Sequence, residues 1–204
     1  MKIFVIGDSI SIHYGPYLEQ YLNGVIEYER KGGTEKALKN LDIPQGANGG
    51  DSSMVLEYLE ARAVKAKIDA DYILINCGLH DIKTDPKTDK KQIPIEQYTA
   101  NLKKIIDVTQ KSGLKVIWIR TTPADEAVHN TIQPDFKRFK ADCIAYNEAA
   151  DKVMADAGVP SIDLYTFTNN LDDDVYCDHV HFHENVREKQ AAFIAGYLNA
   201  IPNC

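Results

Sequence analysis

Short apolar runs alternate with longer amphipathic segments along this chain. Residues 3–6, 72–75 and 116–119 are almost wholly apolar, and each run ends at a turn or polar signal. Such runs are typical of strands buried on both faces. Strands that alternate with helices indicate βαβ units and a parallel sheet. The pattern predicts an α/β fold, in which a five-stranded parallel sheet lies between two layers of helices.

The other elements follow from the same patterning. Two further strands are expected at residues 25–28 and 161–164. Because no internal repeat or linker interrupts the 204 residues, we expect a single domain over residues 1–204. The expected helices begin near Pro16 and after Asp51, and lie at residues 34–41, 95–110, 135–157 and 184–199.

The composition excludes several classes of protein. The chain carries 23 basic and 30 acidic side chains, for a net charge of −7. No basic patch stands out, and we interpret the lysine-rich run at residues 83–91 as solvated surface. Nucleic acid is therefore not an expected partner. Four cysteines without a CxxC pair indicate neither a disulfide scaffold nor a zinc ribbon.

No apolar run reaches the roughly 18 residues that a membrane helix needs, so no membrane partner is expected. The N-terminal apolar run is too short for the apolar region of a signal peptide. We therefore expect a cytoplasmic protein as the sequence is written, or a secreted or periplasmic one if a leader has been trimmed.

The carboxyl ends of the strands locate the candidate site, because open parallel sheets bind ligands beyond these ends. Ser9 follows the first strand after a glycine and an aspartate, where it is either a nucleophile or a helix cap. Asp178 precedes His181 by three residues in a loop before the last helix. At this spacing a carboxylate can orient imidazole Nδ1 and leave Nε2 to accept a serine proton.

A serine that attacks a carbonyl group also needs hydrogen-bond donors for the oxyanion. The backbone N–H groups of Ser9 and of Gly50, which lies in a glycine-rich loop, are two candidates. The segment 78–81 follows another strand and offers a side-chain donor.

Four short motifs occur in this order: Gly7-Asp8-Ser9, Asn48-Gly49-Gly50, Gly78-Leu79-His80-Asp81 and Asp178-His179-Val180-His181. In their order and spacing along the whole chain they resemble the blocks of the SGNH, or GDSL-type, hydrolases. The resemblance implies a flavodoxin-like three-layer sandwich and ester hydrolysis by a serine nucleophile without a metal or cofactor. It also implies that Ser9 is the nucleophile, His181 the general base and Asp178 its orienting partner. Ser9 and Gly50 then donate backbone N–H groups to the oxyanion.

The third motif departs from the family pattern, because His80 stands where the family has asparagine. A neutral histidine offers one N–H group, whose position depends on the tautomer. We predict that His80 donates to the oxyanion in place of asparagine. In a second interpretation His80 binds substrate, and water or Asn76 completes the oxyanion hole. In a third the hole is degraded and the enzyme is weak.

Two further groups near the strand ends are open to more than one interpretation. His179, His181 and His183 alternate in sequence, so either an extended segment places them on one face to bind zinc or only His181 points into the site. Cys77 and Cys177 are either small buried groups or the partners of a regulatory disulfide.

His13 and Tyr14 come directly after the nucleophile. They either line an acyl pocket or only begin the first helix. Asp125, Glu126 and His129 lie in the loop after the fourth strand and either contact a polar substrate or form a solvated loop.

These observations predict an esterase that removes short acyl groups, acetyl above all, from a small molecule or a carbohydrate. The polar loops around the site and the lack of an apolar lid favour a short acyl chain. The alternatives are a thioesterase or lysophospholipase-like hydrolase of longer chains, a weakly active or non-catalytic glycan-binding member, and a metal-dependent hydrolase.

Overall fold

A parallel sheet forms the centre of the computed structural model, which describes residues 1–171 and 174–201. Its strand order is β2-β1-β3-β4-β5, and every neighbouring pair is parallel. The predicted α/β/α sandwich with a five-stranded parallel sheet is confirmed. The strands are β1 (Lys2–Ile6), β2 (Glu27–Arg30), β3 (Tyr72–Ile75), β4 (Lys115–Ile119) and β5 (Ser161–Ile162).

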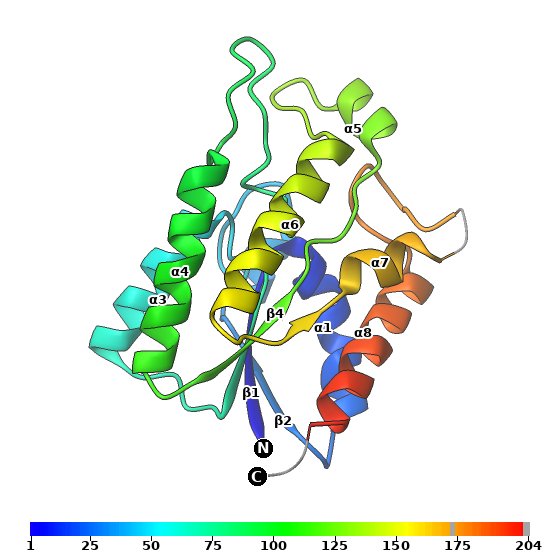
Figure 1. Ribbon diagram of the computed structural model, residues 1–204. Coiled ribbons are helices and arrows are strands. Elements are labelled where there is room, and N and C mark those ends of the chain that lie inside the picture. Colours follow the sequence, from blue (N-terminus) through cyan, green and yellow to red (C-terminus); the bar gives the residue numbers. More distant parts are fainter. Residues whose placement is uncertain (172–173, 202–204) are drawn as a thin grey trace.

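Helices cover both faces of the sheet (Figure 1). On one face lie α1 (Ser9–Leu22), α7 (Leu164–Asn169) and α8 (Glu184–Asn199). On the other lie α3 (Ser52–Lys65), α4 (Ile95–Lys111) and α6 (Lys140–Asp156). Two short helices, α2 (Thr34–Leu38) and α5 (Glu126–Ile132), belong to the connecting segments. None of the helices described is long and apolar enough to cross a membrane.

The core consists mainly of the three central strands and the helix faces that cover them. Ile73, Leu74 and Ile75 of β3 are fully buried, as are Ile117 and Trp118 of β4. Each buried side chain of this kind contributes roughly 1.5–3 kcal/mol relative to an exposed one. The strands therefore hold their carboxyl ends, and the segments that follow them, in a fixed arrangement.

The first helix begins at Ser9 and not near Pro16, as the sequence led us to expect. The Asp8 side chain caps it by accepting a hydrogen bond from the Ile10 N–H at 3.0 Å. Pro16 lies inside the helix and removes one backbone donor. The helix nevertheless continues to Leu22, because Leu18 and Leu22 are fully buried.

Two short helices, α5 and α7, were not predicted. The side chain of Asp125 caps α5 and that of Asp163 caps α7, each accepting from the backbone N–H three residues later. The predicted long helix begins at Lys140 instead of residue 135, because Lys137 forms a β-bridge with Thr84. The edge strand β2 lies two residues later than expected.

A hairpin arm, residues 84–91, projects beyond the carboxyl ends of the strands (Figure 1). An antiparallel bridge between Thr84 and Lys91 closes the arm, and the bridge between Thr84 and Lys137 fastens it to the segment before α6. The run at residues 83–91 was predicted as solvated surface, which holds for residues 85–90 but not for Thr84, which is buried, or for Lys83 and Lys91, which are partly buried.

Candidate active site

Ser9 is the first residue of α1 and follows the central strand β1. At this position its backbone N–H has no carbonyl partner inside the helix. The helix N-terminus also favours negative charge, through its dipole and its free N–H groups. Only 5% of Ser9 is exposed, so its hydroxyl lies in a largely water-free setting.

The hydroxyl of Ser9 lies in a chain of short hydrogen bonds that joins distant parts of the sequence. Ser9 Oγ is 2.8 Å from His181 Nε2, although 172 positions separate the two residues. His181 Nδ1 is 2.7 Å from Asp178 Oδ2. The structure thus brings together the serine, histidine and aspartate that the sequence singled out, in the order that proton transfer from the serine requires.

Asp178 also folds the loop that carries His181. Its Oδ1 accepts hydrogen bonds from the backbone N–H groups of Val180, at 2.8 Å, and His181, at 2.7 Å. Burial tends to raise the pKa of Asp178, but the hydrogen bonds from the His181 ring and from these two N–H groups hold it well below its usual range. An ionised Asp178 accepts from His181 Nδ1–H, which leaves the Nε2 lone pair for the Ser9 proton.

Hydrogen bonds tie the Gly50 loop to the Ser9 turn and to the segment of His80. The Gly49 N–H donates to the Gly7 carbonyl at 2.8 Å. The Ser52 N–H donates to Asp81 Oδ1 at 2.9 Å and to Oδ2 at 3.1 Å. Burial raises the pKa of Asp81 to about 7, against the lowering effect of the bonds from Ser52. The segments of Gly50 and His80 are thus held together beside Ser9.

Gly50 has φ +74°, and a Cβ atom built there would lie 2.5 Å from Met54 Sδ. The position therefore requires glycine. Its N–H donates to Asn48 Oδ1 at 3.0 Å, so the N–H that the sequence assigned to the oxyanion already has a partner. The role of Gly50 as an oxyanion donor stays a prediction. In that role the Gly50 N–H must leave the Asn48 oxygen, or share it, when an oxyanion forms.

His80 is 4% exposed. Burial, together with the charges of Lys83, Arg138 and His181, holds its pKa well below the usual range. The neutral ring retains one N–H donor, as the predicted role requires. Asn76 Nδ2 donates to the Ile119 carbonyl at 2.9 Å and to Thr121 Oγ1 at 3.4 Å, so the alternative in which Asn76 completes the oxyanion hole requires Nδ2 to leave or share these partners.

The three alternating histidines have different partners. His179 Nδ1 lies 2.7 Å from His129 Nδ1, His181 faces Ser9, and His183 Nε2 lies 3.6 Å from Asp174 Oδ1. The turn at residues 178–181 breaks the extended segment that a shared face would need. Within residues 1–171 and 174–201, no group of three His, Cys, Asp or Glu side chains is placed to hold a metal ion.

His13 lies one helical turn after Ser9, and its ring packs edge-on against that of His181, with 5.0 Å between centroids. Burial lowers the pKa of His13 to about 3, so the ring is neutral beside the candidate base. Tyr14 is buried in the core instead. Both residues belong to the first helix, and of the two only His13 contacts the base.

The residues after the fourth strand build α5. Asp125 caps the helix, and Glu126 accepts a hydrogen bond from the Lys140 N–H at 2.7 Å. His129 is fully buried against His179, and burial lowers its pKa to about 3. The solvated-loop interpretation therefore fails for His129, which supports the loop that holds the candidate base.

Cys77 and Cys177 are both free thiols, so the structure contains no disulfide between them. Cys77 is buried, and burial raises the pKa of its thiol well above the usual value. Cys204 lies outside the described residues.

Sequence reasoning missed Arg138, which is 3% exposed and donates from Nε to the Leu79 carbonyl at 2.8 Å. This bond anchors the peptide that leads into His80. An arginine inside a predicted helix gave no signal of a contact with a residue 59 positions away.

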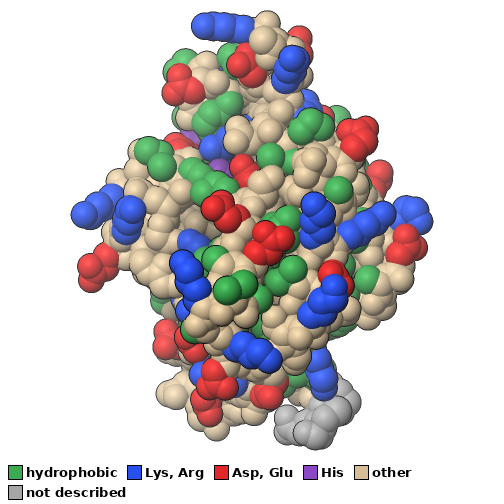
Figure 2. All heavy atoms as spheres, turned by 90° about the vertical axis from the view of Figure 1, so that its left-hand side faces the viewer, with side chains coloured by type: hydrophobic (Ala, Val, Ile, Leu, Met, Phe, Trp, Pro, Cys, Tyr) green, Lys and Arg blue, Asp and Glu red, His purple; other side chains and the backbone are tan. Residues whose placement is uncertain are grey.

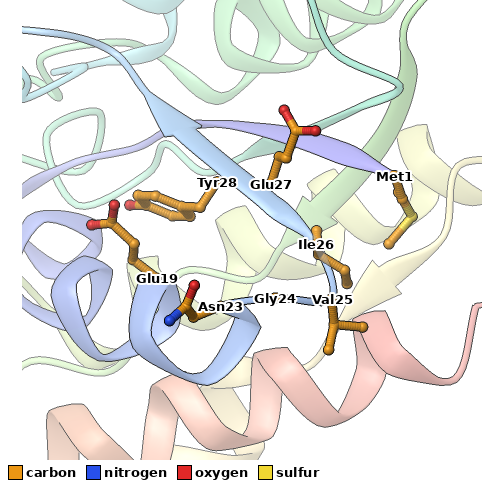
Figure 3. Close-up of a pocket in the computed structure, with 8 residues that line it drawn as sticks. All are labelled: Met1, Glu19, Asn23, Gly24, Val25, Ile26, Glu27 and Tyr28. Carbon is orange, nitrogen blue, oxygen red and sulfur yellow. The ribbon is translucent and has the colours of Figure 1, made fainter.

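A surface hollow of about 370 Å³ lies at the opposite end of the sheet (Figure 3). Glu19 of α1, Asn23 directly after that helix, Met1 and the start of β2 line it. Because Ser9 follows the carboxyl end of β1, this hollow does not belong to the candidate active site.

Comparison with known proteins agrees with this geometry. The profile of the GDSL-like lipase/acylhydrolase family matches residues 5–186. A search of curated proteins found no match. Among solved structures, a lipase/acylhydrolase from Enterococcus faecalis is 19% identical, with a TM-score of 0.71 over 97% of this chain and 94% of that one.

Two other solved structures are similar. A member of the lipolytic G-D-S-L family from Veillonella parvula is 17% identical, with a TM-score of 0.69 over 98% of this chain and 100% of that one. The aryl esterase of M. smegmatis is 15% identical, with a TM-score of 0.67 over 98% of this chain and 99% of that one. The likenesses support the fold, and the profile covers most of the chain. The protein therefore belongs to the GDSL-like lipase/acylhydrolase family of carboxylic ester hydrolases.

Proposed function

We propose that the protein hydrolyses short-chain acyl esters, acetyl esters of carbohydrates above all, through an acyl-enzyme on Ser9. The observation that carries the proposal is the hydrogen-bonded chain from Ser9 Oγ through His181 to Asp178. A serine hydroxyl hydrogen-bonded to an oriented imidazole base is an activated nucleophile.

In the first half of the reaction, Ser9 Oγ bonds to the ester carbonyl carbon while its proton passes to His181 Nε2. The tetrahedral intermediate then loses the alcohol, which takes the same proton from His181. In the second half, water attacks the acyl-enzyme and gives a proton to His181, which returns it to Ser9 Oγ as the carboxylic acid leaves. Throughout, Asp178 stabilises the imidazolium without taking its proton.

The oxyanion of each intermediate lies near the N-terminus of α1 in this proposal. The Ser9 N–H points out of the helix start, where the helix dipole stabilises negative charge. His80 supplies the side-chain donor, and Gly50 supplies a second N–H once it leaves or shares the Asn48 oxygen. These three donors are the predicted oxyanion hole.

The neighbours of Ser9 favour a short acyl chain and a polar alcohol. His13 packs on His181, and the buried His80 and Arg138 are polar as well. Burying a long acyl chain against such groups gains little free energy, because the chain meets polar atoms instead of apolar surface, and a polar group still in contact with water loses its hydration.

A series of p-nitrophenyl esters from acetate to octanoate tests this preference. We expect kcat/KM to fall by at least about tenfold from acetate to octanoate, because each polar group displaced from water costs of the order of 1–3 kcal/mol. Hydrolysis should be unchanged by EDTA, since the proposed steps need only side chains of this chain.

The reverse order of rates would contradict the proposal and favour the thioesterase or lysophospholipase-like alternative. Loss of activity in EDTA would favour metal-dependent hydrolysis. No turnover of any ester would favour a non-catalytic glycan-binding member.

The role of His80 has its own test. We expect His80→Ala to lower kcat about 10²- to 10³-fold, the usual effect of removing one oxyanion donor. His80→Asn should recover most of the loss, because the amide restores a donor. His183→Ala serves as the matched histidine control, because His183 is partly exposed and faces Asp174. Equal kcat values for wild type and His80→Ala would contradict the oxyanion role.

A further inference from the structure

Two cationic side chains, Lys83 and Arg138, lie beside the candidate oxyanion donor. Arg138 Nε donates to the carbonyl of Leu79, the residue before His80. The Lys83 N–H lies 3.4 Å from the His80 carbonyl, in the turn that follows. The charges of both side chains lower the pKa of His80, which places them within electrostatic reach of its ring.

The Arg138 guanidinium is buried without an ion pair among the described residues. Nη1 has no hydrogen-bond partner there. The backbone of Arg138 is fixed from both sides by Asn130, whose Oδ1 accepts from its N–H at 3.0 Å and whose Nδ2 donates to its carbonyl at 2.9 Å. The charges of Asp42, Asp8 and Asp178 act on the guanidinium from beyond ion-pair distance, but burial outweighs them and lowers the pKa of Arg138 to about 10. A buried charge with no direct ion pair is costly, and such groups concentrate at functional sites.

Lys83 lies on the same aromatic ring as Arg138. Its Nζ is 4.2 Å from the centroid of Phe136, and Arg138 Cζ is 5.0 Å from the same centroid. Lys83 Nζ donates to the backbone carbonyl of Asp42 at 3.2 Å. Burial first, and then the charge of Arg138, lower the pKa of Lys83 to about 8. Two like charges held this close are stabilised by an anion that binds both.

The surroundings of this pair are basic although the chain as a whole is acidic. Residues 83–91 and 135–140 together carry seven basic and three acidic side chains, against a net charge of −7 for the chain. The Thr84–Lys137 bridge joins these two segments. Figure 2 shows Lys or Arg side chains at the tip of the projecting arm, where Lys87 and Lys90 are exposed. A basic edge of this kind attracts an anionic ligand toward the site.

We propose that Lys83 and Arg138 form a subsite for a carboxylate on the substrate, so that the preferred ester is an acetylated sugar acid. This inference rests on the proposed function, because it defines the alcohol part of the same substrate. An acetyl group carries no charge, so the carboxylate belongs to the sugar. Arginine suits this task because its planar fork matches the two oxygens of a carboxylate.

Matched substrates test the subsite. The first is an O-acetylated methyl glucuronoside, and the second is the corresponding glucuronamide, which has the same shape without the charge. For the wild type at low ionic strength we expect kcat/KM to be higher for the acid by about tenfold or more, the value of one charge-assisted contact. Added salt should reduce the preference.

The variant Lys83→Met keeps the apolar stem on Phe136 and removes the charge. We expect the acid-to-amide ratio of kcat/KM to fall toward one in Lys83→Met and to recover in Lys83→Arg. Lys87→Met, which removes an exposed lysine from the same arm, should keep the wild-type ratio. An unchanged ratio in Lys83→Met, or a wild-type ratio near one, would overturn the subsite.

Hydrolysis of p-nitrophenyl acetate separates the two proposals. If the wild type cleaves p-nitrophenyl acetate and the glucuronamide without preferring the acid, the subsite fails and the proposed esterase stands. If it cleaves none of the three esters, the proposed function fails and the subsite fails with it.

Discussion

Replacing Ser9 with alanine is expected to lower kcat for p-nitrophenyl acetate by about 10⁴-fold or more, as in other enzymes with a serine nucleophile. In the proposed mechanism the hydroxyl is the group of the hydrogen-bonded chain that bonds to the acyl carbon. Alanine also leaves the fold intact, because the caps and buried contacts of α1 involve other atoms. Steady-state kinetics, with thermal unfolding as the check on folding, measure the effect.

Ser11→Ala is the matched control, because Ser11 is a buried serine in the same helix whose Oγ donates to the Asp8 carbonyl at 2.7 Å. Its kcat should stay within a few-fold of wild type, since such a bond contributes roughly 1 kcal/mol to stability and nothing to the reaction. A phosphonate or sulfonyl reagent should add its mass to wild type and not to Ser9→Ala. Full activity in Ser9→Ala would rule out the proposed mechanism with Ser9 as the nucleophile.

Replacing Asp178 with asparagine is expected to lower kcat by about 10⁴-fold, through the tautomer of His181. The two backbone N–H groups on Oδ1 fix the oxygen of the asparagine amide at that position. The NH₂ group then takes the place of Oδ2 and points at His181 Nδ1, 2.7 Å away. Nδ1 becomes an acceptor, Nε2 carries the proton, and the ring can no longer accept the proton of Ser9.

The matched control is Asp174→Asn, because the side chain of Asp174 is 96% exposed and faces His183. Its kcat should remain at the wild-type value. In Asp178→Asn we expect kcat to fall and the proton of His181 to move from Nδ1 to Nε2. NMR of the labelled imidazole shows which nitrogen carries the proton. A low rate with the proton still on Nδ1 would contradict the tautomer explanation.

The sequence was sufficient to predict the sheet and the residues that meet at Ser9. The buried strands are visible in the sequence as apolar runs. Each motif follows a strand or lies within one loop. The hydrogen bond between Asp178 and His181 is local, so their spacing was informative. Even the missed caps of α5 and α7 are local, and Asp125 and Asp163 carried a readable signal.

The support of the site could not be predicted in the same way. The contacts of Arg138 with Leu79 and of His129 with His179 join residues 59 and 50 positions apart. Both depend on how α5 and the segment before α6 pack over the strand ends, which no local pattern specifies. The hydrogen bond from Gly50 to Asn48 is local. It could still not be predicted, because the composition of a glycine-rich loop does not determine the conformation of the loop.

The separation of Ser9 from His181 along the chain also has a consequence for biosynthesis. A ribosome adds roughly 5–20 residues per second, so the histidine follows the serine by about ten to thirty seconds. During that interval the nascent chain holds a serine without its base, and α8 has still to dock against α1. The serine of a growing chain is therefore an ordinary alcohol, and it becomes reactive only when the last part of the sandwich closes.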